Sequence, residues 1–416
     1  MNILLLGNGY DLNYKLPTSY RNFLLTIDFL TTSNLENIHT VGDVFGNACL
    51  HEEDKFIAGS YKAYKETYAE VLLDAKTLEE LVDQAKRNIW FSYFLRSFNR
   101  EAGWIDVERE IAFVVSRLQS FFDKAGVNFS PHLAFTEIGS KYIIMDVFNF
   151  FVAEAHYSRN TLPTGTRKIK PEYITEYPLG SGDHVINKEK IIGELNDALI
   201  EFAEILKTYL RCFIDKTVEK LVEHDVITQL QPLNYTDVVI TFNYTNTYES
   251  FGSDAQVFHI HGNVNEKIVL GINPDQNDDK DTINTEFIAF KKYYQRTHYD
   301  SDVNYLRWLR DLRNGGDGDS DMRLLVMGHS LDVTDEDIIR DLFGLSTEIN
   351  VLYHSNSSKS SLIRNLVNIF GKEKFDQIRD EQQLAFLPLS MDFSEFAEKQ
   401  AGYSTIRYES ELERFL

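Results

Sequence analysis

Short, mainly apolar runs recur at the start of the chain and again in its second half. They lie at residues 2–6, 237–242, 256–260, 267–270, 323–327 and 349–353. Runs of this length without a polar face are typical of strands in a parallel sheet that helices cover on both faces. Segments with helical spacing follow the first run and the last two, at residues 18–30, 335–343 and 362–370. Strands and helices are therefore predicted to alternate.

The middle of the chain shows a different pattern. Apolar residues recur there at intervals of three and four, most clearly at residues 61–98, 107–122 and 187–223. This spacing places apolar side chains on one face of a helix. We predict an α-helical insertion at residues 21–227, with a polar loop between helices at residues 163–183. Asp106 and Glu108 precede one of the helices, and charge at the helix start is enough to explain them, with a role at the mouth of a ligand site as the alternative.

The two ends of the chain are predicted to form one domain. A strand at residues 2–6 has no neighbouring strand in the sequence, and an isolated strand is not stable. We therefore assign residues 1–20 and 228–416 to one Rossmann-like α/β domain with a parallel sheet, interrupted by the helical insertion. Three independent units in series are the alternative.

The charge and composition of the chain limit the kinds of molecule that it is expected to bind. The 416-residue chain has 42 Lys and Arg against 64 Asp and Glu, a net charge of -22, which repels a nucleic-acid backbone. A small anionic ligand is compatible with this charge, because backbone N–H groups at a helix N-terminus bind phosphate. The first residues do not form a signal peptide, and no run of about 18 apolar residues occurs. We expect a cytoplasmic protein with no membrane partner and no nucleic-acid partner.

Metal binding is not expected from the sequence. The two cysteines, Cys49 and Cys212, are too few for a four-cysteine zinc site in one chain and form no CxxC pair. His259 and His261 are two residues apart, but no carboxylate or third histidine lies close to them in the sequence.

Polar residues at strand ends are the candidate ligand-binding groups, because ligands of open α/β sheets bind beyond the carboxyl ends of the strands. The first run ends in Gly7-Asn8-Gly9, followed by Asp11, and glycine lets the backbone approach a phosphate closely. The full GxGxxG pattern is absent, because Leu12 occupies the third glycine position. A turn between strand and helix without a ligand explains this motif equally well.

Two later strand ends carry Asn243 and His261. Asn243 follows Thr241 and offers both a donor and an acceptor, although an asparagine that caps a helix is the simpler interpretation of this motif alone. His261 ends its strand, and Gly262 leaves room beside the ring. In a strand His259 points the same way. A buried histidine with satisfied hydrogen bonds is the common alternative.

The last candidate segment is Gly328-His329-Ser330, after the run at residues 323–327. Small and hydroxyl residues at such a position bind phosphate or ribose in nucleotide sites. A helix N-cap at Asp332 or Thr334 is the alternative, and the two interpretations are compatible.

Taken in order, these segments resemble the motifs of the Sir2 superfamily. The sirtuin pattern GAGxS with IPDFR is similar to residues 7–11 with Leu16-Pro17, and the pattern TQNID is similar to residues 241–245. The pattern HG is similar to residues 261–262, and the pattern GTSLxV to residues 328–333. The chain more closely resembles the AbiH family of bacterial abortive-infection (phage-defence) proteins. The segments that carry this resemblance are GNGYDLNYKLPTSY, WIDVE, FNYTNTYE, HIHGN and GHSLDVTDED. This second likeness covers most of the chain, including part of the insertion.

The resemblance implies an NAD site. In Sir2-like NAD hydrolases of bacterial defence, an asparagine and a histidine at these motifs are the catalytic pair, here Asn243 and His261. It also implies that the turn at residues 7–9 binds the diphosphate, that Gly328 and Ser330 hold phosphate and ribose, and that Asn356 lies near the adenosine end. The nucleotide-binding residues assigned in this way are Gly7, Asn8, Gly9, Asp11, Thr241, Gly328, His329, Ser330 and Asn356.

The chain also departs from the sirtuin pattern. Asp11 replaces a small hydroxyl residue, Ser19 and Tyr20 stand where Phe and Arg are expected, and the aspartate of TQNID is missing. The nicotinamide contacts therefore do not transfer. The zinc cysteines are absent as well, so protein deacylation is disfavoured.

The expected function is NAD hydrolysis with release of nicotinamide, acting in abortive infection by NAD depletion. A neutral His261 would accept a proton from a ribose hydroxyl or from a water held by Asn243. The alternatives are a module that senses NAD or ADP-ribose, an ADP-ribosyltransferase and a nuclease-type toxin. Because such an enzyme needs control, we expect a homo-oligomer or a phage-derived or host trigger protein. The aromatic stretch at residues 90–104 is either an interface of this kind or core of the insertion.

Overall fold

A six-stranded parallel sheet forms the centre of the computed structural model, which describes residues 1–48, 55–100, 105–124, 132–134, 143–154, 166–176, 184–230, 233, 236–272, 285–314, 321–380 and 384–390. Its strands are β1 (Asn2–Leu6), β7 (Val238–Thr241), β8 (Gln256–His259), β9 (Arg323–Met327), β10 (Glu348–Tyr353) and β11 (Leu384–Pro388). Their spatial order is β11-β10-β9-β1-β7-β8, and every pairing is parallel. Numbered along the chain and read from β8, this is the 3-2-1-4-5-6 order of dinucleotide-binding folds. The predicted α/β fold is confirmed, including the pairing of the first strand with the later ones.

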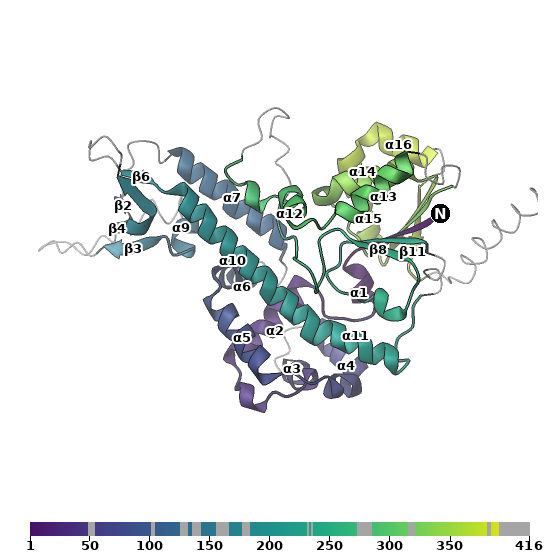
Figure 1. The fold of residues 1–416 in the computed structure, drawn as a ribbon, viewed down its shortest axis with the longest axis horizontal. Helices are drawn as coiled ribbons and strands as arrows, with labels where there is room; N and C mark the ends of the chain where they lie inside the picture. Colours follow the sequence, from purple (N-terminus) through teal and green to yellow (C-terminus); the bar gives the residue numbers. More distant parts are fainter. Residues whose placement is uncertain are drawn as a thin grey trace, which may run out of the picture.

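Both faces of the sheet are buried, which explains the continuous apolar runs. Ile3 and Leu5 of β1 belong to the core on one face. The helices over that face are α13 (Val303–Arg313), α14 (Glu336–Leu345), α15 (Asn356–Phe370) and α16 (Lys372–Asp380). Leu4 and Leu6 point the other way and belong to a larger core shared with the helical insertion. Successive residues of one strand thus hold helices on opposite sides (Figure 1).

The insertion is mainly helical, as predicted. Its helices are α2 (Tyr20–Thr32), α3 (Val41–Ala48), α4 (Lys55–Glu70), α5 (Ala75–Arg87), α6 (Ile89–Arg100), α7 (Val107–Lys124), α9 (Ile143–Val147), α10 (Lys188–Tyr209) and α11 (Lys216–Glu223). A π-helical segment, Leu210–Asp215, joins α10 to α11 without a break. Trp90 of α6 is fully buried and donates to the Leu195 carbonyl at 2.8 Å. The described aromatic residues of the stretch at residues 90–104 are therefore core of the insertion.

The insertion also contains two small sheets that the sequence pattern did not predict. One has the antiparallel order β2 (His132–Ala134), β4 (Thr166–Ile169), β3 (Phe151–Glu154), and the other pairs β5 (Ile174–Glu176) with β6 (His184–Ile186). The predicted loop at residues 163–183 was thus wrong for the described residues 166–176. Strands of three or four residues are too short to show a clear alternation. Figure 1 shows them at the start of α10, away from the parallel sheet.

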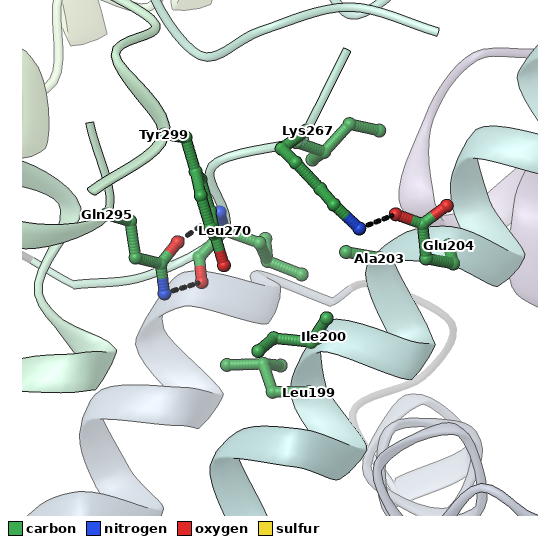
Figure 2. A pocket seen from close by; sticks show the side chains of 9 residues that line it. Leu199, Ile200, Ala203, Glu204, Lys267, Leu270, Gln295 and Tyr299 are labelled. Carbon is green, nitrogen blue, oxygen red and sulfur yellow. Dashed lines mark hydrogen bonds and ion pairs between the residues drawn. The ribbon is translucent and has the colours of Figure 1, made fainter. Parts of the chain in front are cut away.

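The run at residues 267–270 was predicted as a strand, and this was wrong. The side chain of Gln295, in α12 (Lys292–Tyr299), accepts from the Leu270 N–H at 2.8 Å and donates to the Leu270 carbonyl at 3.0 Å. Figure 2 shows this segment between α12 and α10, where Lys267 lies 2.9 Å from Glu204 of α10. The Gln295 side chain thus makes the hydrogen bonds to the Leu270 backbone that a neighbouring strand would otherwise make. An apolar run looks the same in the sequence in both cases.

The remaining local predictions have mixed outcomes. The helices predicted at residues 18–30, 107–122, 335–343 and 362–370 correspond to α2, α7, α14 and α15. Edge strand β11 was not predicted. Within the described ranges, no helix is both long and apolar enough to cross a membrane.

Candidate functional site

The loops that follow β1, β7, β8 and β9 meet around a cavity of about 420 Å³. It lies beyond the carboxyl ends of the strands, where the strand order reverses between β1 and β9, and this is the usual ligand position in such sheets. Most of the predicted site residues line it, namely Gly7, Asn8, Asp11, Asn243, His261, Gly328, His329 and Ser330. Gly9, Thr241 and Asn356 do not line it.

The glycine turn after β1 packs directly against the loop after β9. The Gly7 N–H donates to the Met327 carbonyl at 3.1 Å, and the Gly9 N–H donates to the Gly328 carbonyl at 2.9 Å. A Cβ atom on Gly9 would lie 2.7 Å from Gly328 Cα, and one on Gly328, whose φ is +70°, would lie 2.2 Å from Tyr10 N. Close contact between the two loops therefore explains these glycines. Their role in diphosphate binding stays a prediction.

Asn243 is held in the cavity wall by its backbone. Its N–H donates to Thr241 Oγ1 at 3.0 Å, and its carbonyl accepts from His259 Nδ1 at 3.0 Å. Burial would lower the pKa of His259, but Glu249, 2.6 Å from its Nε2, raises it. The Asn243 Oδ1 is buried and has no hydrogen-bond partner among the described residues. Thr241 and His259 thus fix the backbone of Asn243 in the cavity wall.

His261 follows β8 directly. Its ring meets Phe242 edge-on, with the ring centroids 5.0 Å apart. Gly262 after it has a φ of +71°, and a Cβ there would lie 2.0 Å from the Lys267 carbonyl oxygen, so this turn requires glycine. Burial, and next the charge of Lys292, lowers the pKa of His261 to about 4. The ring is therefore neutral at physiological pH.

A buried lysine joins two carboxylates in the wall of the cavity. The Lys292 side chain is 2% exposed, and its Nζ lies 2.9 Å from Glu108 Oε2 and 3.0 Å from Asp335 Oδ1. Glu108 belongs to α7 of the insertion, whereas Lys292 and Asp335 belong to the sheet domain. Asp335 also lies near two imidazoles, with Oδ1 3.4 Å from His261 Nε2 and Oδ2 3.6 Å from His329 Nε2.

The two carboxylates of this cluster have opposite pKa shifts. Burial raises the pKa of Glu108 to about 7, and Lys292 offsets the effect only in part. Burial acts in the same direction on Asp335, but Lys292 and the two histidines outweigh it and hold the pKa of Asp335 well below its usual range. At neutral pH the cluster therefore contains an ionised Asp335, a charged Lys292 and a Glu108 near its titration midpoint.

The loop after β9 fixes the tautomer of His329. The Leu331 N–H donates to His329 Nδ1 at 2.9 Å, so the ring hydrogen lies on Nε2, toward Asp335. The Ser330 carbonyl accepts from Asn365 Nδ2 of α15 at 2.9 Å. These contacts hold the loop in place beside the cavity.

The N-cap predicted at Asp332 or Thr334 for the helix at residues 335–343 lies one turn earlier, because Asp332 caps the 3-10 segment Val333–Asp335, and the N-cap residue of α14 itself is Asp335. The Asp332 side chain accepts from the Thr334 N–H at 3.1 Å, and both residues line the cavity. Asn356 is the first residue of α15 and follows the N-cap Ser355. Its role near an adenosine stays a prediction.

Asp11, which replaces a small hydroxyl residue of the sirtuin pattern, has a structural role. It is 1% exposed, and its Oδ2 accepts from Thr245 Oγ1 at 2.7 Å, which ties α1 (Gly9–Asn13) to the loop after β7. Burial raises the pKa of Asp11 to about 6. Burial and Asp11 together raise the pKa of Asp215, in the π-helical segment, to about 7, and Asp215 accepts from Asn246 Nδ2 at 2.9 Å.

The helical insertion supplies part of the cavity wall. Its contributions are Tyr20 of α2, Asp106 and Glu108 at the start of α7, and Leu206 and Leu210 at the junction of α10 with the π-helical segment. The Tyr20 and Tyr244 hydroxyls lie 3.5 Å apart, and Tyr244 donates to the Val269 carbonyl at 3.1 Å. Tyr20 was noted in the sequence only as a departure from the sirtuin pattern, and Asp106 and Glu108 only as charges before a helix, whereas Leu206 and Leu210 carry no sequence signal.

A metal centre does not form in the described part of the chain. No group of three or more His, Cys, Asp or Glu side chains there is arranged to hold an ion. Lys292 occupies the position between Glu108 and Asp335 that a cation would need.

Comparison with known proteins gives one match. A family model described as "Bacteriophage abortive infection AbiH" matches residues 3–353, which include the first strand, the insertion and the four loops around the cavity. No curated protein and no solved structure matches the chain. The resemblance to the Sir2 superfamily stays a prediction.

Proposed function

The chain belongs to the AbiH family of bacteriophage abortive-infection proteins, and from this premise we propose that it is an NAD hydrolase that releases nicotinamide. One observation carries the proposal. His261 is a buried, neutral imidazole in the wall of a cavity at the switch point of a sheet with dinucleotide-binding strand order. Loss of NAD would stop host metabolism and with it phage multiplication.

The charge of the cavity wall favours the nicotinamide end of NAD. Its carboxylates are Asp11, Asp106, Glu108, Asp332 and Asp335, and its lysine, Lys292, is already paired with two of them. The nicotinamide ring of NAD is cationic, whereas the diphosphate is anionic. The acidic side of the wall attracts the ring and repels the diphosphate, so we expect the nicotinamide riboside end beside Asp106 and Glu108.

The reaction breaks the bond between C1′ of the ribose and the nicotinamide nitrogen. The bonding electrons leave with nicotinamide, which becomes neutral, and positive charge develops on C1′. A water held by the Asn243 amide oxygen attacks C1′ and gives its proton to His261, which later releases the proton to solvent. The products are nicotinamide, ADP-ribose and one proton. The ionised Asp335 stabilises the protonated imidazole of His261.

The test is a product assay. The purified protein is incubated with NAD, and nicotinamide and ADP-ribose are quantified beside His261→Ala and Asn243→Ala. Two exposed residues of α12 and α13 give matched controls, His298→Ala and Asn304→Ala. The site variants should lose at least about a hundredfold in rate, as expected for loss of a proton acceptor, whereas both controls should keep their activity.

The same assay separates the alternatives. It is repeated in extracts of phage-infected cells that express the chain, so that an enzyme requiring a trigger is detected. NAD that binds tightly but stays intact in both settings would favour a sensing module. Labelled ADP-ribose attached to protein would indicate a transferase. Either result would refute the hydrolase.

A further inference from the structure

Asp335 contacts three basic side chains in the cavity wall. Lys292 Nζ lies 3.0 Å from its Oδ1, His261 Nε2 lies 3.4 Å from the same oxygen, and His329 Nε2 lies 3.6 Å from Oδ2. The Asp335 side chain is 9% exposed and the His261 side chain 5%. These contacts leave Asp335 ionised and fixed in place beside His261.

An ionised carboxylate decides where a neutral imidazole carries its hydrogen. A lone pair on His261 Nε2 would repel the Asp335 oxygen, whereas an N–H there is attracted to it. His261 Nε2 is fully buried and has no hydrogen-bond partner among the described residues, so the Asp335 oxygen at 3.4 Å acts on it as a charge. His261 lines the cavity, and because Nε2 is buried beside Asp335, Nδ1 is the ring nitrogen left to meet a ligand.

We propose that Asp335 is a positioning residue, which holds His261 as the Nε2–H tautomer and so leaves Nδ1 as the atom that accepts the proton of the attacking water. This inference rests on the proposed function. The water gives its proton to Nδ1 as its oxygen bonds to C1′, and the resulting imidazolium is stabilised by the Asp335 carboxylate. Lys292 and His329 keep the carboxylate in position.

The distance between His261 and Asp335 fits this role. At 3.4 Å the contact is longer than a good hydrogen bond, but catalytic hydrogen bonds are often long before substrate binds and tighten as charge develops. Lys292 lowers the basicity of His261 through its charge, whereas Asp335 raises it. Lys292 therefore helps to keep the His261 imidazole neutral before the reaction, and Asp335 stabilises the imidazole once it is protonated.

The first test measures the tautomer directly. The 15N spectrum of protein labelled on histidine distinguishes a nitrogen that carries hydrogen from one that does not, and loss of one signal set in His261→Gln assigns His261 among the 11 histidines. We expect hydrogen on Nε2 in the unaltered protein. Hydrogen on Nδ1 would overturn the inference, and this measurement needs no variant of Asp335.

The second test is kinetic. Asp335→Leu removes the acceptor and leaves Lys292 paired with Glu108. We expect the single tautomer to be lost and kcat to fall by at least about a hundredfold, with NAD affinity changed by less than about threefold. Asp341→Leu, at a partly exposed carboxylate farther along α14, is the control and should keep both properties. If Asp335→Leu does not fold, Asp335→Asn, which keeps the volume but not the charge, takes its place.

The outcomes distinguish the inference from the proposed function. An unchanged tautomer and kcat in the Asp335 variant would refute the positioning role while NAD hydrolysis stands. A parallel loss of kcat and of NAD affinity, without a tautomer change, would also refute it, because a merely structural residue gives that pattern. If the unaltered protein cleaves NAD neither alone nor in extracts of phage-infected cells, the proposed function fails, and the tautomer spectrum still decides how Asp335 acts on His261.

Discussion

Glu108→Gln should change how the stability of the protein depends on pH. Burial raises the pKa of Glu108 from its ordinary value of 4.5 to about 7. Between these values the folded protein holds a proton that the unfolded chain has lost. The contribution of Glu108 to the free energy of unfolding therefore falls as pH rises from about 4.5 to about 7, and it stays low above that.

The pKa values set the size of this effect. A rise of about 2.5 pKa units corresponds to about 3 kcal/mol, since each unit is worth about 1.4 kcal/mol. The Glu108 side chain is only 20% exposed, so solvent screens little of it. Glutamine has nearly the same volume and still offers an oxygen to Lys292, but it does not titrate. The variant should therefore gain about 3 kcal/mol relative to the unaltered protein between about pH 4.5 and about pH 8.

Denaturant unfolding at several pH values measures this difference. Comparing two proteins removes the contributions of other buried acids with raised pKa values, such as Asp11 and Asp215. Glu79→Gln, on the exposed face of α5, is the control and should follow the unaltered protein at every pH. A Glu108→Gln curve parallel to that of the unaltered protein would show that burial does not raise the pKa of Glu108.

Three further predictions test the loops and the substrate. In thermal unfolding, Gly328→Ala should lower the free energy of unfolding by more than about 3 kcal/mol or fail to fold, because its φ is +70° and the new Cβ would lie 2.2 Å from Tyr10 N. The control is Gly344→Ala, where the new Cβ meets nothing within 4 Å, and it should be neutral in the same experiment. Gln295→Leu leaves the Leu270 N–H and carbonyl unpaired and should cost about 2–4 kcal/mol in denaturant unfolding. NADH, whose dihydronicotinamide is neutral and a poor leaving group, should not be cleaved when the products are separated by chromatography, and cleavage at the NAD rate would contradict the mechanism.

The parallel sheet was predictable because each strand is buried on both faces. Burial on two faces requires apolar residues at consecutive positions, as at residues 2–6, and that pattern is visible in the sequence. Pairing of this strand with later ones followed from the lack of a local partner. The order of the strands was not predictable in the same way, because every strand of a doubly covered sheet has the same pattern.

The site was predictable only where it lies at strand ends. Asn243, His261 and Gly328 stand out because each follows an apolar run. The contact between Glu108 and Lys292 had no such signal, since it depends on how α7 packs beside α12. Asp335 looked like an ordinary residue at a helix start, and only the fold brings two histidines to it.

Charged side chains of the insertion and of the sheet domain form one connected cluster. Glu108, supplied by the insertion, lies 2.9 Å from Lys292, and Lys292 lies 3.0 Å from Asp335. A displacement of α7 by about 1–2 Å, a usual size for helix shifts in regulated proteins, would break the first contact and leave the whole Lys292 charge to Asp335. That change would weaken the hold of Asp335 on His261 without any movement of the loops around the cavity. Under the proposed function, a trigger or a second subunit that acts on the insertion would therefore reach His261 through three side chains, which would give the hydrolase a physical means of control.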